Sequence, residues 1–110
     1  MKNKKLLNRI DKILFDKIIE EATVDCYSEY EQIAGWACVF EDNLFVPCKC
    51  SIGKERAILE KIDTNNNSTE IFGVIKLNKS RIRVPIEDVS FEDFDFMKYT
   101  EAYKYWKKHG

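Results

Sequence analysis

The residue pattern changes after Asn43, and this change limits the fold more than any other feature of the sequence. Up to that point, apolar residues recur every three to four positions, as on one face of a helix. Beyond it, they gather in short runs with the length and alternation of β-strands, and the last residues again have a helical pattern. Helices followed by short antiparallel strands and a terminal helix predict an α+β fold.

Two helices are predicted in the first part of the chain. The first covers residues 4–22 and is amphipathic, with its polar side chains largely opposite the apolar ones. The second is a short acidic helix from Glu29 to about Trp36. Its N-cap is Asp25 or Ser28, because short oxygen side chains accept hydrogen bonds from the free amides of a first turn. The apolar residues of the first helix are Leu6, Leu7, Ile10, Ile13, Leu14 and Ile18.

Four extended runs predict a small, bent, antiparallel sheet of about four to five strands, of the SH3-like kind. Residues 78–80 are a candidate for a tight turn, and residues 63–69 for a longer polar loop. A short C-terminal helix is predicted over residues 99–108. The four extended runs are residues 44–50, 56–62, 70–77 and 81–86.

With 110 residues, 45% of them hydrophobic, the chain can build one compact core, so a single domain over residues 1–110 is expected. The 18 basic and 19 acidic residues leave a net charge of −1, which attracts neither nucleic acid nor an anionic membrane surface. No segment has the length and apolarity of a membrane span. Polar residues at positions 8, 9, 11 and 12 interrupt the apolar core that a signal peptide needs, so a cytoplasmic location is predicted.

The four cysteines are predicted to be free thiols that pack as small apolar residues. A zinc site is disfavoured, because one residue separates Cys48 from Cys50 and structural zinc sites use gaps of two to four. A cysteine nucleophile is disfavoured as well, because the only histidine, His109, lies at the end of the chain. The other two cysteines are Cys26 and Cys38.

Acidic residues are concentrated in two segments. From Ile18 to Cys48 there is no Lys or Arg, although an even distribution of basic residues would place about five in this window. Calcium needs six to eight oxygen ligands, several of them charged, so two acidic segments folded together could bind it. Ordinary solvated acids are the alternative. The first set is Glu20, Glu21, Asp25, Glu29, Glu31, Glu41 and Asp42, and the second is Glu87, Asp88, Glu92, Asp93, Asp95 and Glu101.

The stretch DTNNNS, residues 63–68, begins like the calcium loop of an EF-hand, with oxygen side chains at loop positions one, three and five. Position six is Ser68 rather than glycine, and position twelve is Val74 rather than glutamate. Strand patterns also lie on both sides of the stretch. A polar loop between strands is therefore the preferred interpretation.

The segment VDCYSEYEQIAGWACVFEDNLFVPCKC, from residue 24 onward, resembles the cyanobacterial-type calcium-binding protein family. Members of that family share V-D-A-Y-x-x-x-E-x-x-x-G-W and, after a gap, L-E-D-x-L-x-F-P-F-x-A. Further agreement follows at residues 73–75, 82–86 and 100–106. The resemblance covers residues 24–110 and leaves residues 1–23 as an N-terminal helical extension. The matching residues of the first half are Val24, Asp25, Tyr27, Glu31, Gly35, Trp36, Glu41, Asp42, Leu44 and Pro47.

The resemblance implies a small bacterial protein that buffers or senses cytoplasmic calcium without an EF-hand and is not an enzyme. Its ligand would be a divalent cation, Ca²⁺. Cysteines at positions where the family tends to have alanine or an aromatic residue agree with a packing role. The implied ligands, which match acids of the family, are Asp25, Glu31, Glu41 and Asp42, to which charge alone adds Asp93 and Asp95.

These ligands are expected to meet around the short acidic helix. A buried Trp36 would fix this helix, so that Asp25 and Glu31 at its start face Glu41 and Asp42 beyond the turn that follows it. Holding four like charges together is unfavourable, and a divalent cation would relieve that repulsion.

The alternative function is that of a protein-interaction module, in which an SH3-like barrel binds a protein partner and there is no functional metal site. An enzyme ranks third, because a carboxylate pair acts as acid and base only in a pocket. The surface of such an interaction module would comprise Lys79, Arg81, Arg83, Tyr27, Tyr30, Phe94 and Tyr99.

Overall fold

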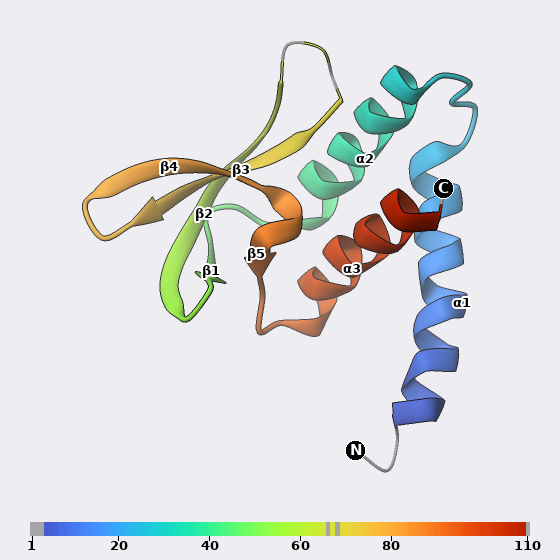
Figure 1. Cartoon of the computed structure of the whole chain (residues 1–110), viewed down its shortest axis with the longest axis horizontal. Coiled ribbons are helices and arrows are strands. Elements are labelled where there is room, and N and C mark those ends of the chain that lie inside the picture. The colour runs from blue at the N-terminus through green and yellow to red at the C-terminus, as the bar shows by residue number, and fades with distance from the viewer. Residues whose placement is uncertain (1–3, 66, 68, 110) are drawn as a thin grey trace.

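A computed structural model describes the backbone of residues 4–65, 67 and 69–109, and their side chains from Lys12 onward. Three helices lie on one side of a five-stranded antiparallel sheet, which confirms the predicted α+β fold (Figure 1). Among the described residues, no helix is long and apolar enough to cross a bilayer. In chain order the elements are α1 (Lys4–Thr23), α2 (Glu29–Asn43), β1 (Cys48–Ile52), β2 (Glu55–Thr64), β3 (Ile71–Leu77), β4 (Ser80–Pro85), the 3-10 helix η1 (Ile86–Asp88), β5 (Val89–Ser90) and α3 (Phe94–His109).

The sheet has the strand order β4-β3-β2-β1-β5, and every neighbouring pair is antiparallel. The register of β2 against β3 shifts between Leu59 and Lys61, and irregularities of this kind bend a sheet. Only Asn78 and Lys79 separate the paired ends of β3 and β4. Asn78 has a φ of 58°, a left-handed conformation that asparagine tolerates in tight hairpins. The predicted bent sheet and tight turn are thus confirmed.

Two helices are longer than predicted. Instead of ending near Trp36, α2 continues to Asn43, because its buried positions keep the helical spacing beyond the tryptophan. The last helix begins at Phe94 rather than Tyr99. Asp93 caps its start, since its carboxylate and its carbonyl both accept hydrogen bonds from amides of the first turn.

The strand boundaries also differ from the predictions in places. The first strand begins at Cys48, because Leu44 is the C-cap of α2 and Pro47 has no N–H to donate to a ladder. The loop predicted over residues 63–69 is shorter, because Asp63 and Thr64 belong to β2. The elements η1 and β5 were not predicted, since three and two residues are too few to show a periodicity.

The cysteines follow the packing prediction only in part. Cys50 is buried in the core, whereas Cys26 and Cys48 are half-buried. Cys38 is exposed, because its position in α2 falls on the solvent face of the helix, so the packing prediction was wrong for this residue. All four are free thiols.

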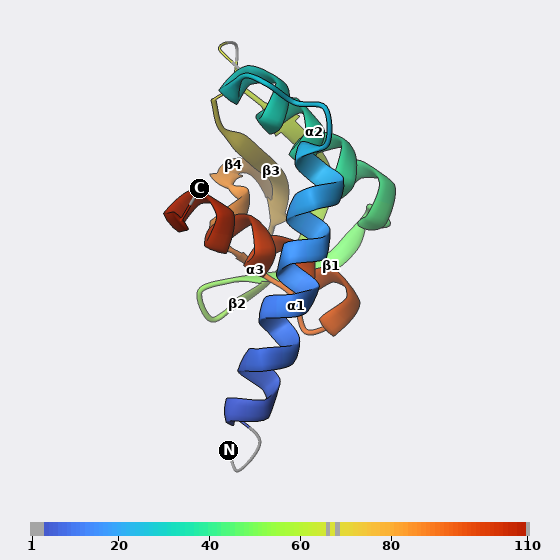
Figure 2. The ribbon, with the colours of Figure 1, turned by 90° about the vertical axis from the view of Figure 1, so that its right-hand side faces the viewer.

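The first helix runs across the outer side of the other two, as Figure 2 shows from the side of the helices. Within its described side chains, Ile18 and Ala22 are buried. The end of α1 approaches α2 at Gly35 so closely that a Cβ there would overlap the carbonyl oxygen of Ala22. This contact explains why a glycine lies inside a helix, where it would otherwise be unfavourable.

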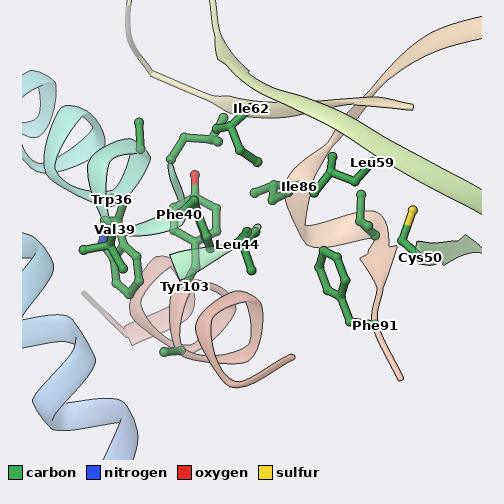
Figure 3. Packing of buried hydrophobic residues seen from close by; sticks show 14 of the residues in the cluster. Trp36, Val39, Phe40, Leu44, Cys50, Leu59, Ile62, Ile86, Phe91 and Tyr103 are labelled. Atoms are coloured by element: carbon green, nitrogen blue, oxygen red, sulfur yellow. The ribbon is translucent and has the colours of Figure 1, made fainter. Parts of the chain in front are cut away.

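The core lies between the helices and one face of the sheet (Figure 3). Trp36 and Phe40 of α2 pack against Tyr103 of α3, with ring centroids 5.3 and 5.5 Å from that of Tyr103. Leu59 of β2 and Ile86 of η1 cover them from the sheet side. The predicted burial of Trp36 is therefore confirmed, since its side chain is fully buried.

The raised pKa values of two side chains, Cys50 and Tyr103, predict that the stability of the fold decreases in alkaline solution. Burial raises the pKa of the Cys50 thiol from 9.0 to about 11 and that of the Tyr103 hydroxyl from 10.0 to about 12. Between these values the folded chain keeps protons that the unfolded chain has lost, so the free energy of unfolding decreases as pH rises from about 9 to about 12. Urea unfolding at pH 8, 9, 10 and 11 measures this. In Cys50→Ala the decrease between pH 9 and 11 is expected to be smaller, though not absent, because burial also raises the pKa of the Cys48 thiol. An identical pH profile in this variant would contradict the role of Cys50.

Candidate metal centre

The start of α2 carries Asp25 and Glu31, two of the predicted ligands. Asp25 follows the end of α1 with a φ of 57°, a left-handed conformation that aspartate tolerates. Ser28 is the N-cap of α2: its hydroxyl oxygen accepts a hydrogen bond from the amide of Glu31 and donates one to the carboxylate of that residue, at 3.2 Å. Both acids are exposed, and Glu31 takes part in the helix cap.

The end of α2 carries Glu41 and Asp42, both exposed, followed by Asn43. The side chain of Asn43 is fixed from two sides. Its amide donates to the carbonyl of Val39 at 2.8 Å, and its oxygen accepts a hydrogen bond from the Tyr99 hydroxyl at 3.0 Å. This last bond ties the end of α2 to α3.

The expected arrangement of these two acid pairs was wrong. Glu31 and Glu41 lie ten positions apart in one continuous helix, which separates them by about 15 Å along the axis at 1.5 Å per residue. The prediction placed them face to face because it ended the helix near Trp36. The ligand role of each acid stays a prediction, but Asp25 and Glu31 lie at the opposite end of α2 from Glu41 and Asp42.

The start of α3 carries Asp93 and Asp95, which are both exposed. One carboxylate oxygen of Asp93 accepts a hydrogen bond from the Asp95 amide at 2.9 Å and so serves the helix cap. Asp95 lies 3.7 Å from the ammonium group of Lys98. The start of α3 is near the end of α2, because the rings of Phe45 and Phe96 are 6.1 Å apart.

The electrostatics of the α2 terminus are unusual. The C-terminal end of a helix carries partial negative charge and free carbonyl groups, so lysine or arginine is favoured there. The last turn of α2 has no basic residue and instead holds Glu41 and Asp42. Within the side chains that the structure describes, neither acid forms an ion pair. Negative charge therefore accumulates at this end of the helix.

Three oxygen types are available at this terminus: two carboxylates, backbone carbonyl groups and the Asn43 amide oxygen. These are the ligand types that calcium takes in proteins. Among the described side chains, however, no three His, Cys, Asp or Glu residues are close enough together to hold a metal ion. A cation bound here would thus have two carboxylates at most in its present surroundings and would keep several waters.

The stretch that begins like an EF-hand loop connects two strands, as the sequence predicted. Asn65 closes the connection, since its side-chain oxygen accepts hydrogen bonds from the amides of Thr69 and Glu70. Asp63 lies within β2, 3.4 Å from the guanidinium of Arg83. Two residues of the stretch, 66 and 68, lie outside the described part of the chain.

The surface expected for an interaction module is not assembled as predicted. Arg81 and Arg83 lie on β4, where they pair with Glu60 and Asp63. Tyr27 lies in the connection between α1 and α2, and Tyr30 lies in the first turn of α2. This part of the chain is at the upper right of Figure 1, across the molecule from β4 at the left. The two arginines of that surface are therefore separated from Tyr27 and Tyr30.

One charged cluster was not anticipated from the sequence. The ammonium group of Lys107 lies 2.7 Å from the carboxylate of Glu87 and 3.0 Å from that of Glu70. Burial lowers the pKa of Lys107, but hydrogen bonds to the two glutamates outweigh this and raise it. The three residues are far apart in sequence, so no local pattern indicates the cluster, which joins α3 to η1 and to the start of β3.

Comparisons with known proteins agree with the fold. The model of one protein family, CcbP, described as calcium binding, matches residues 16–107, which include all six predicted ligands. The crystal structure of Anabaena CcbP has a TM-score of 0.72 and 14% sequence identity, over 87% of this chain and 89% of that chain. A calcium binding protein in its calcium-binding form has the same score and identity, over 90% and 92%. No curated protein matches the chain.

Proposed function

Because the chain belongs to the CcbP family of calcium-binding proteins, we propose that it binds calcium at the end of α2 through Glu41 and Asp42. The observation that supports this site above the others is the accumulation of negative charge there. Two exposed acids lie at the negative end of a helix whose last turn has no base. A divalent cation would relieve the repulsion between the two carboxylates.

The other predicted ligands divide between the two ends of α2. Asp95 and Asp93 are the nearer pair, because hydrogen bonding between Asn43 and Tyr99 ties the start of α3 to this end of α2. We propose that Asp95 contributes an oxygen, directly or through water, after release from Lys98. Asp93 accepts a hydrogen bond in the cap of α3, so we propose that it adds negative charge to the calcium site but does not coordinate the ion.

Asp25 and Glu31 form a second, separate acidic group at the start of α2. A helix N-terminus carries partial positive charge, so it disfavours a cation. The carboxylate of Glu31 also accepts a hydrogen bond from the Ser28 hydroxyl. This pair is therefore proposed as the weaker of the two cation sites.

A site with two or three carboxylates and several waters binds calcium weakly, with a Kd of roughly 10⁻⁴ to 10⁻³ M. We propose that the protein buffers calcium with such a site, in the cytoplasm and without an EF-hand. A cytoplasmic location fits the four free thiols, which a reducing compartment preserves.

The test compares two double variants that remove the same charge from opposite ends of α2. With a Kd of about 1 mM, about 10 mM calcium stabilises the wild type by about 1.4 kcal/mol, or roughly 5–8 °C in Tm. Glu41→Gln with Asp42→Asn is expected to lose this shift and the heat of binding in calorimetry. The control, Asp25→Asn with Glu31→Gln, is expected to keep most of both.

Two results would contradict the proposal. A wild type with neither a Tm shift nor heat on addition of calcium would refute calcium binding itself. A calcium response that persists in the Glu41 and Asp42 variant, and disappears in the control, would place the site at the start of α2.

A further inference from the structure

An open pocket of about 950 Å³ lies between the sheet and the start of α3. Its walls come from β1, β2, the end of β3 with the turn that follows it, the segment before α3 and the first turn of α3. Neither Glu41 nor Asp42 lines it. A volume of this size suits a small molecule, since ligand pockets range from about 300 to 1,000 Å³.

Three basic residues line the pocket: Lys49 of β1, Arg56 of β2 and Lys76 of β3. The strand register explains why they converge. Lys49 and Lys76 both lie directly opposite Ile58, one on each neighbouring strand. Arg56 precedes Ile58 by two positions in the same strand and so has its side chain on the same face. The three basic side chains therefore surround Ile58, with Lys49 and Lys76 about 10 Å apart at the backbone.

These three cations have no carboxylate partner among the described side chains. Five other basic residues of the chain do form ion pairs, as Lys107 does with Glu70 and Glu87. Three unpaired cations around one residue repel each other, and an anion bound between them would remove that repulsion. Arginine and lysine are also the residues that most often contact phosphate groups.

The rest of the lining indicates more than a simple anion site. Ile58 and Phe96 provide apolar surface beside the cations. Glu92 and Asp93, from the segment before α3, line another part of the pocket and can accept hydrogen bonds. The pocket thus offers three kinds of contact: cations, an apolar surface and hydrogen-bond acceptors.

We propose that this pocket binds a phosphate-bearing small molecule of the nucleotide type. The phosphate lies between Lys49, Arg56 and Lys76, and the ring packs on the apolar surface. Hydroxyl or amino groups of the ligand donate to Glu92 and Asp93. This function is additional to calcium binding, and none of the proposed calcium ligands, Glu41, Asp42 and Asp95, lines the pocket.

Titration calorimetry with AMP, ATP and sodium phosphate, each in EDTA, tests the proposal without interference from calcium. The wild type is expected to bind AMP and ATP more tightly than phosphate. Lys49→Met with Lys76→Met is expected to weaken nucleotide binding at least about tenfold, because two charged contacts are lost. Arg56→Met, a single change at an exposed residue, is expected to weaken it as well.

The matched control is Lys61→Met with Lys108→Met, which removes the same charge outside the pocket and is expected to bind like the wild type. An equal loss in both double variants would show unspecific charge attraction and overturn the proposal, as would a wild type that binds no nucleotide. The calcium-dependent Tm shift, measured without EDTA, is expected to persist in the Lys49 and Lys76 variant. It therefore separates failure of this proposal from failure of the calcium site.

Discussion

Replacement of Gly35 by alanine is expected to lower the free energy of unfolding by about 3 kcal/mol or more, and Tm by roughly 12–15 °C. The added Cβ would overlap the carbonyl oxygen of Ala22, which is a backbone atom and cannot turn away as a flexible side chain would. The end of α1 must then move off α2. Thermal unfolding followed by circular dichroism measures the effect.

Whether the free energy of unfolding rises or falls in Gly35→Ala shows whether helix propensity or the packing against α1 has the larger effect. Alanine in place of glycine inside a helix normally gains about 1 kcal/mol, so any loss must come from the contact with α1. Ala34 is the neighbouring exposed residue, and Ala34→Ser adds one heavy atom to α2 away from that contact. This control is expected to change stability by no more than about 0.5 kcal/mol. A stabilised Gly35→Ala variant would show that the two helices are not in close contact at this residue.

The sequence predicted the fold well where a pattern extends over many residues. The N-terminal helix, four of the strands and the turn near Asn78 follow from apolar periodicity and turn residues. The error at Trp36 has a physical reason: Gly35 looks like a helix end in a sequence, because glycine favours such positions. Only the three-dimensional structure shows that this glycine is required by the approach of α1 in the middle of a helix.

The candidate site was harder to predict than the fold, and for a related reason. The acids of the first segment could be identified by charge and by family resemblance, but their grouping depends on where α2 ends. Moving that end from Trp36 to Asn43 turns one set of four acids into two pairs at opposite ends of a helix. The pairing of Asn43 with Tyr99 joins residues 56 positions apart in sequence, so no local pattern could indicate it.

Replacement of Trp36 by alanine is expected to have a comparable or larger effect on stability, about 3–5 kcal/mol. The indole is fully buried and lies within 6 Å of three other aromatic rings, those of Phe40, Tyr103 and Trp106, measured between centroids. Its removal leaves a cavity between α2 and α3 that these rings can fill only in part. Urea unfolding, followed by the fluorescence of the remaining Trp106, measures the loss.

The matched control for Trp36 is Tyr27→Ala, which truncates an aromatic residue that is 87% exposed in the connection before α2. Its cost is expected to stay within about 0.5 kcal/mol, because little buried surface is lost. Since small domains are stable by only about 5–15 kcal/mol, Trp36→Ala alone is expected to leave a marginally folded chain, whereas the Tyr27 variant unfolds like the wild type. Equal urea midpoints for the two variants would mean that Trp36 does not hold α2 against α3. The end of α2, with Glu41 and Asp42, would then lack the support that positions it beside α3.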